Sequence, residues 1–83
     1  MKLVYFAWVR TRIGKAEETV HPPPEVHDVE TLLEWLKRHS PGHAEALKDV
    51  SALRIAVNHE HVSIHHAVHP GDEVAIFPPV TGG

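Results

Sequence analysis

The sequence predicts an α+β fold in which one main helix packs across a mixed sheet of four to five strands. The length of 83 residues, with 42% hydrophobic side chains, suits one core and one domain. Short segments rich in β-branched and aromatic residues occur near both ends of the chain. Between them lies a segment with helical periodicity, so strands and helix are expected to form two packed layers.

The N-terminal segment predicts a β-hairpin. Residues 3–9 are apolar and rich in strand-forming side chains, residues 10–15 suit a turn, and residues 17–20 suit a second strand. Alternation along the first strand separates its side chains into two faces. One face would carry Leu3, Tyr5, Ala7 and Val9, and the other Val4, Phe6 and Trp8.

The main helix is expected after the stiff segment Pro22-Pro23-Pro24. Asp28 suits the N-cap, and an apolar stripe with i, i+3, i+4, i+7 spacing follows it. The stripe consists of Val29, Leu32, Leu33 and Leu36. Ser40-Pro41-Gly42 is expected to stop this helix, and residues 43–52 to contain only a short further helical turn.

Three further strands are predicted, over residues 53–57, 62–64 and 72–77. The order of hairpin, helix and further strands is that of the β-grasp fold of ubiquitin. We therefore expect a ubiquitin-like β-grasp domain over residues 1–77 and a flexible C-terminal tail over residues 78–83.

The composition excludes several classes of function. The absence of cysteine rules out disulfides and thiolate chemistry. The net charge of −3, without a basic stripe, argues against nucleic acid as a partner. No apolar run approaches the roughly 20 residues that span a bilayer. We expect a cytoplasmic protein without membrane contact.

The C-terminal tail is the most informative segment. Pro78 and Pro79 cannot continue a paired central strand, so the chain must leave the sheet there. No charged side chain follows, and the two terminal glycines could pass through a channel too narrow for a Cβ atom. The tail is thus suited to threading into a partner, with the terminal carboxylate in front; its residues are Pro78, Pro79, Val80, Thr81, Gly82 and Gly83.

Several motifs resemble the small, sulfur-carrying subunit family of molybdopterin synthase. The diagnostic part is Gly71-Asp72-Glu73-Val74-Ala75-Ile76-Phe77-Pro78-Pro79-Val80-Thr81-Gly82-Gly83, preceded by Ala56-Val57-Asn58 and Val62-Ser63. Phe6-Ala7-Trp8-Val9-Arg10 and the Gly14 turn are similar to the first hairpin of the family. The resemblance covers essentially the whole chain.

The resemblance implies a mechanism centred on Gly83. An adenylating enzyme of the ubiquitin-activating type would use ATP to adenylate its carboxylate, and a sulfur donor would convert the adenylate into a thiocarboxylate. The large catalytic subunit would receive the tail and pass the sulfur to cyclic pyranopterin monophosphate, in a heterotetramer of two small and two large subunits. The chain alone would hold no permanent cofactor and no catalytic side chain.

A partner-binding surface is expected beside the tail. If Val74 and Ile76 point to the core, alternation places Ala75 and Phe77 outside. Phe6, on the outer face of the first strand, would join this surface. His61 departs from the family pattern, which has an apolar contact residue at this position.

Nine histidines are unusual for this length, and most of them lie in one segment. His59 and His61 would share a strand face, yet a zinc site needs a third or fourth ligand, so we expect no metal. The remaining histidines of the segment are His65, His66 and His69, and those elsewhere, all expected to be exposed, are His21, His27, His39 and His43.

Three alternative functions remain at this point. A ubiquitin-like modifier would join its C-terminus to lysines of target proteins. A thiamine-pathway sulfur carrier would share the fold and the Gly-Gly end, although residues 77–81 favour the molybdopterin branch. A histidine-rich metal chaperone would not need Gly82 and Gly83.

Overall fold

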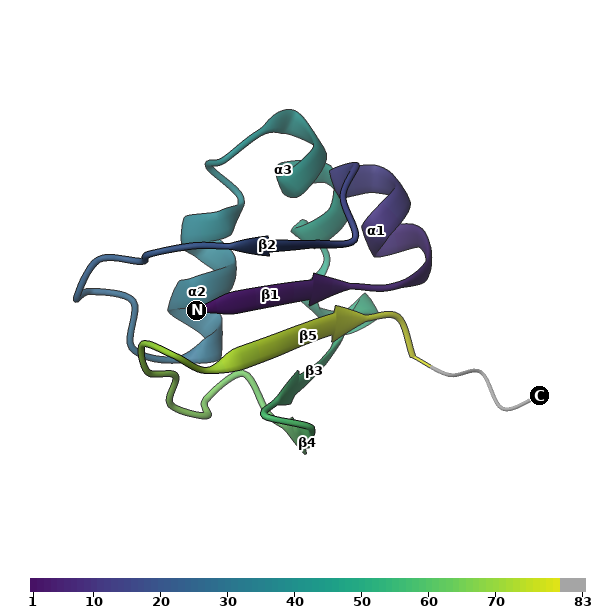
Figure 1. Cartoon of the computed structure of the whole chain (residues 1–83). Helices are drawn as coiled ribbons and strands as arrows, with labels where there is room; N and C mark the ends of the chain where they lie inside the picture. The colour runs from purple at the N-terminus through teal and green to yellow at the C-terminus, as the bar shows by residue number, and fades with distance from the viewer. Residues whose placement is uncertain (80–83) are drawn as a thin grey trace.

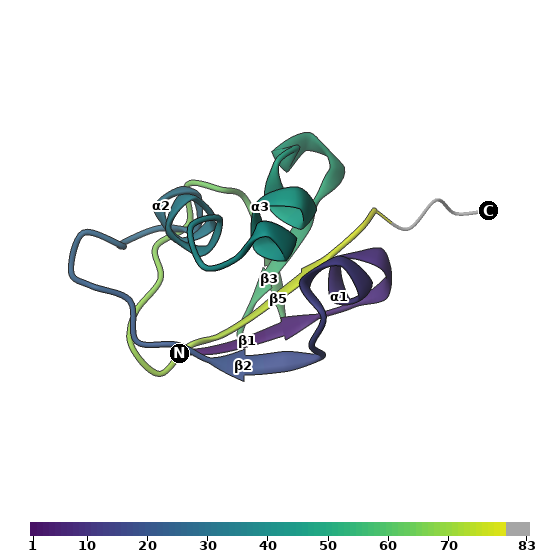
Figure 2. The same ribbon diagram turned by 90° about the horizontal axis from the view of Figure 1, so that it is seen from above.

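The structure, a computed structural model, describes residues 1–79 of the chain. It contains a five-stranded mixed sheet with the helices on one face (Figures 1 and 2). The strands are β1 (Lys2–Tyr5), β2 (Glu17–Thr19), β3 (Arg54–Val57), β4 (Glu60–Val62) and β5 (Glu73–Phe77). The helices are α1 (Ala7–Ile13), α2 (Val29–Leu36) and α3 (Pro41–Leu47), with a 3-10 turn, η1 (Val50–Ala52). The predicted α+β fold is confirmed, with three helices instead of one main helix.

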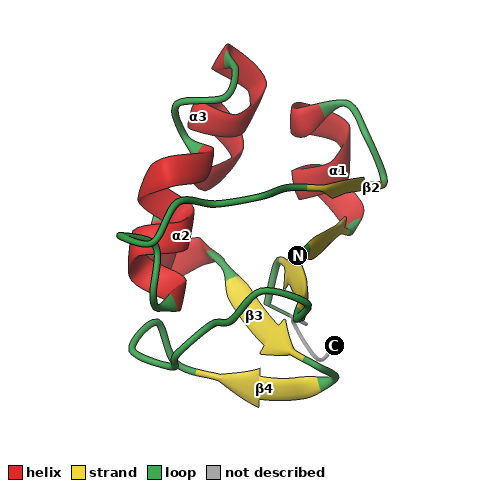
Figure 3. Ribbon diagram, turned by 60° about the vertical axis from the view of Figure 1, so that its left-hand side comes forward, coloured by secondary structure: helices red, strands yellow, loops and turns green. Residues whose placement is uncertain are grey.

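The strand order β2-β1-β5-β3-β4 places the last strand at the centre of the sheet. β5 runs parallel to β1, and antiparallel to β3 on its other side. The edges are β2, which pairs with β1, and β4, which pairs with β3. Figure 3 shows β3 and β4 side by side. Because β5 is held on both sides, the point at which the chain leaves the sheet after Phe77 is firmly positioned.

The prediction that a turn connects the first two strands into a hairpin is wrong. β1 and β2 do pair antiparallel, but β1 ends at Tyr5 and helix α1 connects the two strands. Val9 and Ile13, four residues apart, are buried on one face of α1. Gly14, with φ 93°, ends the helix in the left-handed conformation that glycine adopts without strain. The i, i+4 spacing therefore outweighs the β propensity of residues 7–9.

The prediction for α2 is confirmed. Asp28 caps the helix in a reciprocal capping box with Thr31, and the apolar stripe that starts at Val29 is buried. Ser40-Pro41 starts the next helix, α3, because the Ser40 side chain accepts a hydrogen bond from the backbone N–H of His43 and proline occupies the first turn. The segment Ser40-Pro41-Gly42, which was expected only to stop α2, thus forms the N-terminus of α3.

The core lies between the sheet and the helices. It is formed by the inward side chains of the strands and by the apolar faces of the helices; fully buried examples are Leu3, Val9, Val29, Leu32, Leu36, Leu47, Val74 and Ile76. The helices α1, α2 and α3 lie on the same side of the sheet, so within residues 1–79 no helix covers its other face (Figure 2). Within residues 1–79, no helix is long and apolar enough to span a bilayer.

Candidate functional site at the end of β5

An aromatic patch, formed by Phe6, His61 and Phe77, lies beside the end of β5. The ring centroids of Phe6 and Phe77 are 6.4 Å apart, and those of His61 and Phe77 are 5.4 Å apart, both in edge-to-face geometry. Phe6 is 49% exposed and is the large apolar side chain that residues 1–79 leave most open to solvent. Aromatic side chains are thus held at the surface, where a partner could cover them, as in a binding site.

The backbone holds Phe6 in this position. The Phe6 N–H donates to the carbonyl oxygen of Ile76 at 3.2 Å, which ties the end of β1 to β5. Ala7 follows with φ 53°, a left-handed conformation that costs energy in a residue with a Cβ atom. This turn ends β1, starts α1 and leaves the Phe6 side chain pointing out beside Phe77.

The expected orientations of β5 are confirmed. Val74 and Ile76 are buried, whereas Ala75 and Phe77 are half-buried on the opposite face. His61 pairs with Ala56 across β3 and β4 and is exposed. Phe6 is exposed as expected, but it is the residue that precedes α1, beyond the end of β1, and not a strand residue.

The tail itself is described only at its start. Pro78 and Pro79 are half-buried and no longer belong to the sheet. The remaining predicted site residues, Val80, Thr81, Gly82 and Gly83, lie outside the described residues, so their role stays a prediction.

A buried polar network joins Tyr5, Glu18, His43 and Ser40, and no pattern in the sequence had predicted it. His43 was expected to be exposed, and this is wrong: it is only 4% exposed. Its Nε2 donates to Oε2 of Glu18 at 2.7 Å, and the hydroxyl of Tyr5 donates to the same oxygen at 2.6 Å. Ser40 Oγ lies 2.7 Å from the other ring nitrogen, Nδ1. The network joins β1, β2 and α3 next to Phe6.

The surroundings of Tyr5 and Glu18 in this network shift the pKa values of both side chains. Burial raises the pKa of the Tyr5 phenol, and the hydrogen bond and negative charge of Glu18 raise it further, so Tyr5 stays a neutral donor. Burial alone would raise the pKa of the Glu18 carboxyl. The hydrogen bonds from His43 and Tyr5 and the charges of His43 and Lys15 outweigh it, and the pKa falls below its ordinary value of 4.5.

The histidine-rich segment, residues 59–69, does not bring side chains together into a metal site. Within residues 1–79, no three histidine, aspartate or glutamate side chains come together as a metal site would require. The prediction that His59 and His61 share a strand face is wrong, because His59 lies in the turn before β4 with φ 70°. Its Nε2 lies 3.6 Å from a carboxylate oxygen of Glu73 instead.

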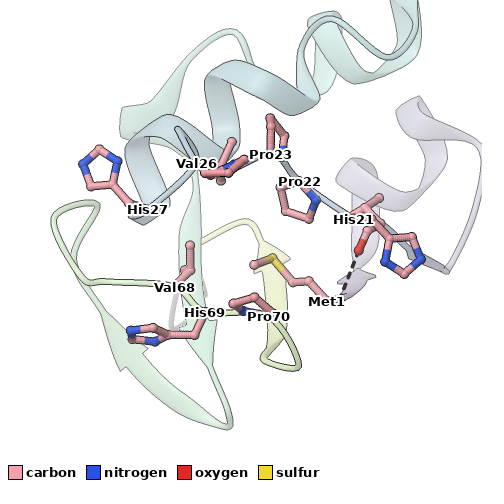
Figure 4. A pocket seen from close by; sticks show the side chains of 11 residues that line it. Met1, His21, Pro22, Pro23, Val26, His27, Val68, His69 and Pro70 are labelled. Carbon is pink, nitrogen blue, oxygen red and sulfur yellow. Dashed lines mark hydrogen bonds between the residues drawn. The ribbon is translucent and has the colours of Figure 1, made fainter.

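A cleft of about 570 Å³ lies at the other end of the domain, beside the N-terminus (Figure 4). Its walls are mainly apolar, from Met1, Val20, the three consecutive prolines, Val26, Val68 and Pro70. The imidazoles of His21, His27 and His69 stand at its rim (Figure 4). The cleft begins at the strand ends opposite Phe77, so it is separate from the aromatic patch.

A family model described as the ThiS family matches residues 3–83. The chain belongs to the ThiS family. The match runs through the last glycine, so it includes the tail as well as the folded domain. The molybdopterin synthase sulfur carrier subunit of Escherichia coli is 40% identical over 83 residues, which cover all of this chain and 99% of that protein.

Solved structures of other proteins share the fold of this ThiS-family chain. A putative molybdopterin converting factor subunit 1 from Pyrococcus furiosus is 33% identical, with a TM-score of 0.76 and 95% of each chain covered. SAMP1 from Haloferax volcanii is 26% identical, with a TM-score of 0.74, over 100% of this chain and 98% of that chain. The comparisons confirm the resemblance and the β-grasp fold that the sequence analysis predicted.

Proposed function

We propose that this chain is the sulfur carrier subunit of a molybdopterin synthase. The observation that carries the proposal is the similarity to the carrier subunit of Escherichia coli, which extends over the whole of this chain and so over its terminal Gly-Gly. The aromatic patch beside the exit of the tail supports it, because a protein that grips the tail would contact this patch at the same time.

The proposed reaction takes place on the carboxylate of Gly83. An adenylating enzyme joins it to the α-phosphate of ATP and releases pyrophosphate, which gives an acyl-adenylate with a good leaving group. Hydrosulfide from a sulfur donor then forms the new carbon–sulfur bond and expels AMP, and loss of its proton leaves a thiocarboxylate. The activating enzyme holds the ATP, and this chain supplies the reacting group.

The tail that carries the thiocarboxylate would then enter the large subunit of the synthase. The assembly would contain two small and two large subunits. The folded domain fixes the origin of the tail, because β5 is central and Pro78-Pro79 stiffens the exit. Gly82 and Gly83 allow the passage of the backbone through a narrow channel. Phe6, Ala75, Phe77 and His61 would lie against the partner, and no side chain of this chain would act in catalysis.

Intact-mass analysis tests the proposal. The chain is coexpressed with an adenylating enzyme and a sulfur donor from the same organism. We expect a mass gain equal to the exchange of one oxygen for one sulfur. Deletion of Gly83, or addition of one residue after it, should abolish the gain while the fold is retained. An unchanged mass with an enzyme that demonstrably forms adenylates would contradict the proposal.

Protein modification is the second candidate, because SAMP1 is named a small archaeal modifier protein and shares the fold. A modifier also needs an adenylated C-terminus, so the adenylate alone does not separate the two functions. Isopeptide adducts of higher mass on lysines of other proteins would indicate the modifier, whereas a free thiocarboxylate indicates the carrier.

A further inference from the structure

The apolar cleft beside the N-terminus is held open by the fold itself. One wall comes from the loop before α2, which contains the three consecutive prolines, and the other from the loop before β5 together with Met1. At one end the Val68 N–H donates to the carbonyl oxygen of His27 at 3.0 Å, which joins the two loops. At the other end the Val20 N–H donates to the carbonyl oxygen of Met1 at 2.9 Å. Because the prolines also fix the backbone, little of the cleft has to be ordered when a ligand enters.

The cleft has the shape and size of a small-molecule site. Figure 4 shows its apolar side chains in two facing rows, with the labelled His27 and His69 at one end of the rows and His21 at the other. Its volume of about 570 Å³ falls within the range of about 300–1,000 Å³ that is typical of ligand sites. An elongated apolar molecule can therefore lie along the cleft between the two rows.

The charge of the lining favours an acidic group on this molecule. The chain has 11 aspartates and glutamates and a net charge of −3, yet none of these carboxylates lines the cleft. The ionisable groups that do line it are three imidazoles and Met1, whose N-terminal ammonium donates to the carbonyl oxygen of Val20 at 3.1 Å. A carboxylate at the rim thus meets groups that carry a positive charge or gain one on protonation.

Two carboxylates lie beside the imidazoles at one end without lining the cleft. Oδ2 of Asp72 is 3.9 Å from Nδ1 of His69, so Nε2 is the nitrogen that His69 can offer to a ligand. Nε2 of His27 is 3.6 Å from Oδ2 of Asp28, and its Nδ1 lies 3.0 Å from the carbonyl oxygen of Glu25. Both carboxylates already accept hydrogen bonds from other groups of the domain. His69 is therefore the residue best placed to bind an acidic group.

We propose that the cleft binds a linear apolar carboxylate, such as a medium-chain fatty acid. The alkyl chain lies between the two rows, and the carboxylate accepts a hydrogen bond from the protonated ring of His69. The bound molecule connects the N-terminus with the loops before α2 and β5, and it leaves the end of β5 open. The site is thus independent of the proposed function, because a ligand here and a protein that grips the tail do not compete.

Amide NMR spectra of the isotope-labelled full-length chain test the site, with octanoate added at about pH 6, where an ordinary histidine is mostly protonated. We expect saturable shifts that are largest at Val20, Val26, Val68 and His69. Hexanoate, which is two methylenes shorter, should bind about fifteenfold more weakly, because each buried methylene contributes about fourfold in affinity. Octanamide, which has the same chain without the charge, should bind about fivefold more weakly than octanoate.

H69E and H66E form a matched pair, because both residues are exposed in the same segment and only His69 lines the cleft. H69E should weaken octanoate binding more than tenfold, whereas H66E should leave it within about twofold. H69Q, which keeps a neutral polar side chain, should lose about fivefold, and the spectra themselves show whether each variant is folded.

Four results would overturn the site. They are the absence of saturable shifts with octanoate, shifts centred on Phe6 and Phe77 instead of the cleft, equal affinity for octanoate and octanamide, and equal weakening by H66E and H69E. Each of them would leave the proposed function untouched, since thiocarboxylate formation on Gly83 is measured separately by mass.

Discussion

Replacement of Glu18 by alanine tests the buried network between β1, β2 and α3. One oxygen of Glu18 accepts from the Tyr5 hydroxyl at 2.6 Å and from the His43 ring at 2.7 Å. Tyr5 is 1% exposed and His43 is 4% exposed, so both donors lose their acceptor in a buried place. Each buried unsatisfied donor costs about 1–3 kcal/mol.

The Glu18 side chain is itself 13% exposed, so water can replace part of the lost contacts. We therefore expect the loss to lie at the lower end of the range for two donors, about 2–3 kcal/mol. Urea unfolding measures it: with a slope of about 1 kcal/mol per M for a small domain, the midpoint should fall by about 2–3 M. The slope itself should not change.

Two controls separate the network from a general effect of charge. E17A removes a neighbouring glutamate whose side chain is 61% exposed and pairs with Lys2 at 3.6 Å, and it should cost less than about 1 kcal/mol. E18Q keeps an oxygen that can accept both hydrogen bonds, and it should lie between E18A and the parent chain. If E18A shifts the urea midpoint no further than E17A, the reasoning about unsatisfied donors is refuted.

Three other perturbations have defined outcomes. Gly42→Ala should destabilise the fold by about 1–3 kcal/mol in urea unfolding, because its Cβ would lie 2.5 Å from the carbonyl oxygen of Arg12; unchanged stability would mean that α1 and α3 separate easily. Ala7→Gly should raise the free energy of unfolding by about 1 kcal/mol, because glycine adopts φ 53° without strain; a loss in a thermal melt would contradict this. The Glu18 carboxylate has a lowered pKa in the folded state, so it stabilises the fold above the ordinary value of 4.5, and this contribution disappears as pH falls through the lowered pKa. The stability advantage of the parent chain over E18Q, measured by urea unfolding across this range, should therefore vanish in acid, and an advantage that does not vary with pH would disprove the assignment.

The sequence predicted the elements whose signals agree with one another. At α2, the cap and the apolar stripe both indicate a helix that starts after Asp28, and the structure has it there. In β5, alternation alone placed Phe77 outside and Ile76 inside. At residues 7–9 the signals conflict, because aromatic and β-branched side chains favour a strand while Val9, Ile13 and Gly14 favour a helix that ends in a left-handed cap.

The buried network could not be predicted because its members are distant in the sequence. Glu18 and His43 are 25 positions apart and meet only when α3 packs beside β2. A histidine in a polar segment gives no sign of burial by itself. The available signal was Ser40-Pro41, which indicates the first turn of a helix and would have placed His43 on a helical face.

The central position of β5 has a consequence for biosynthesis. This strand is made last, yet β1 and β3 do not contact each other in the sheet and are joined only through it. A nascent chain that has not reached residue 77 thus lacks the middle of its sheet and cannot bury the apolar faces of β1 and β3. Folding must wait until the ribosome has added the strand that leads directly into the tail, so a chain whose translation stops before residue 77 is expected to be a protease-sensitive fragment instead of a folded domain.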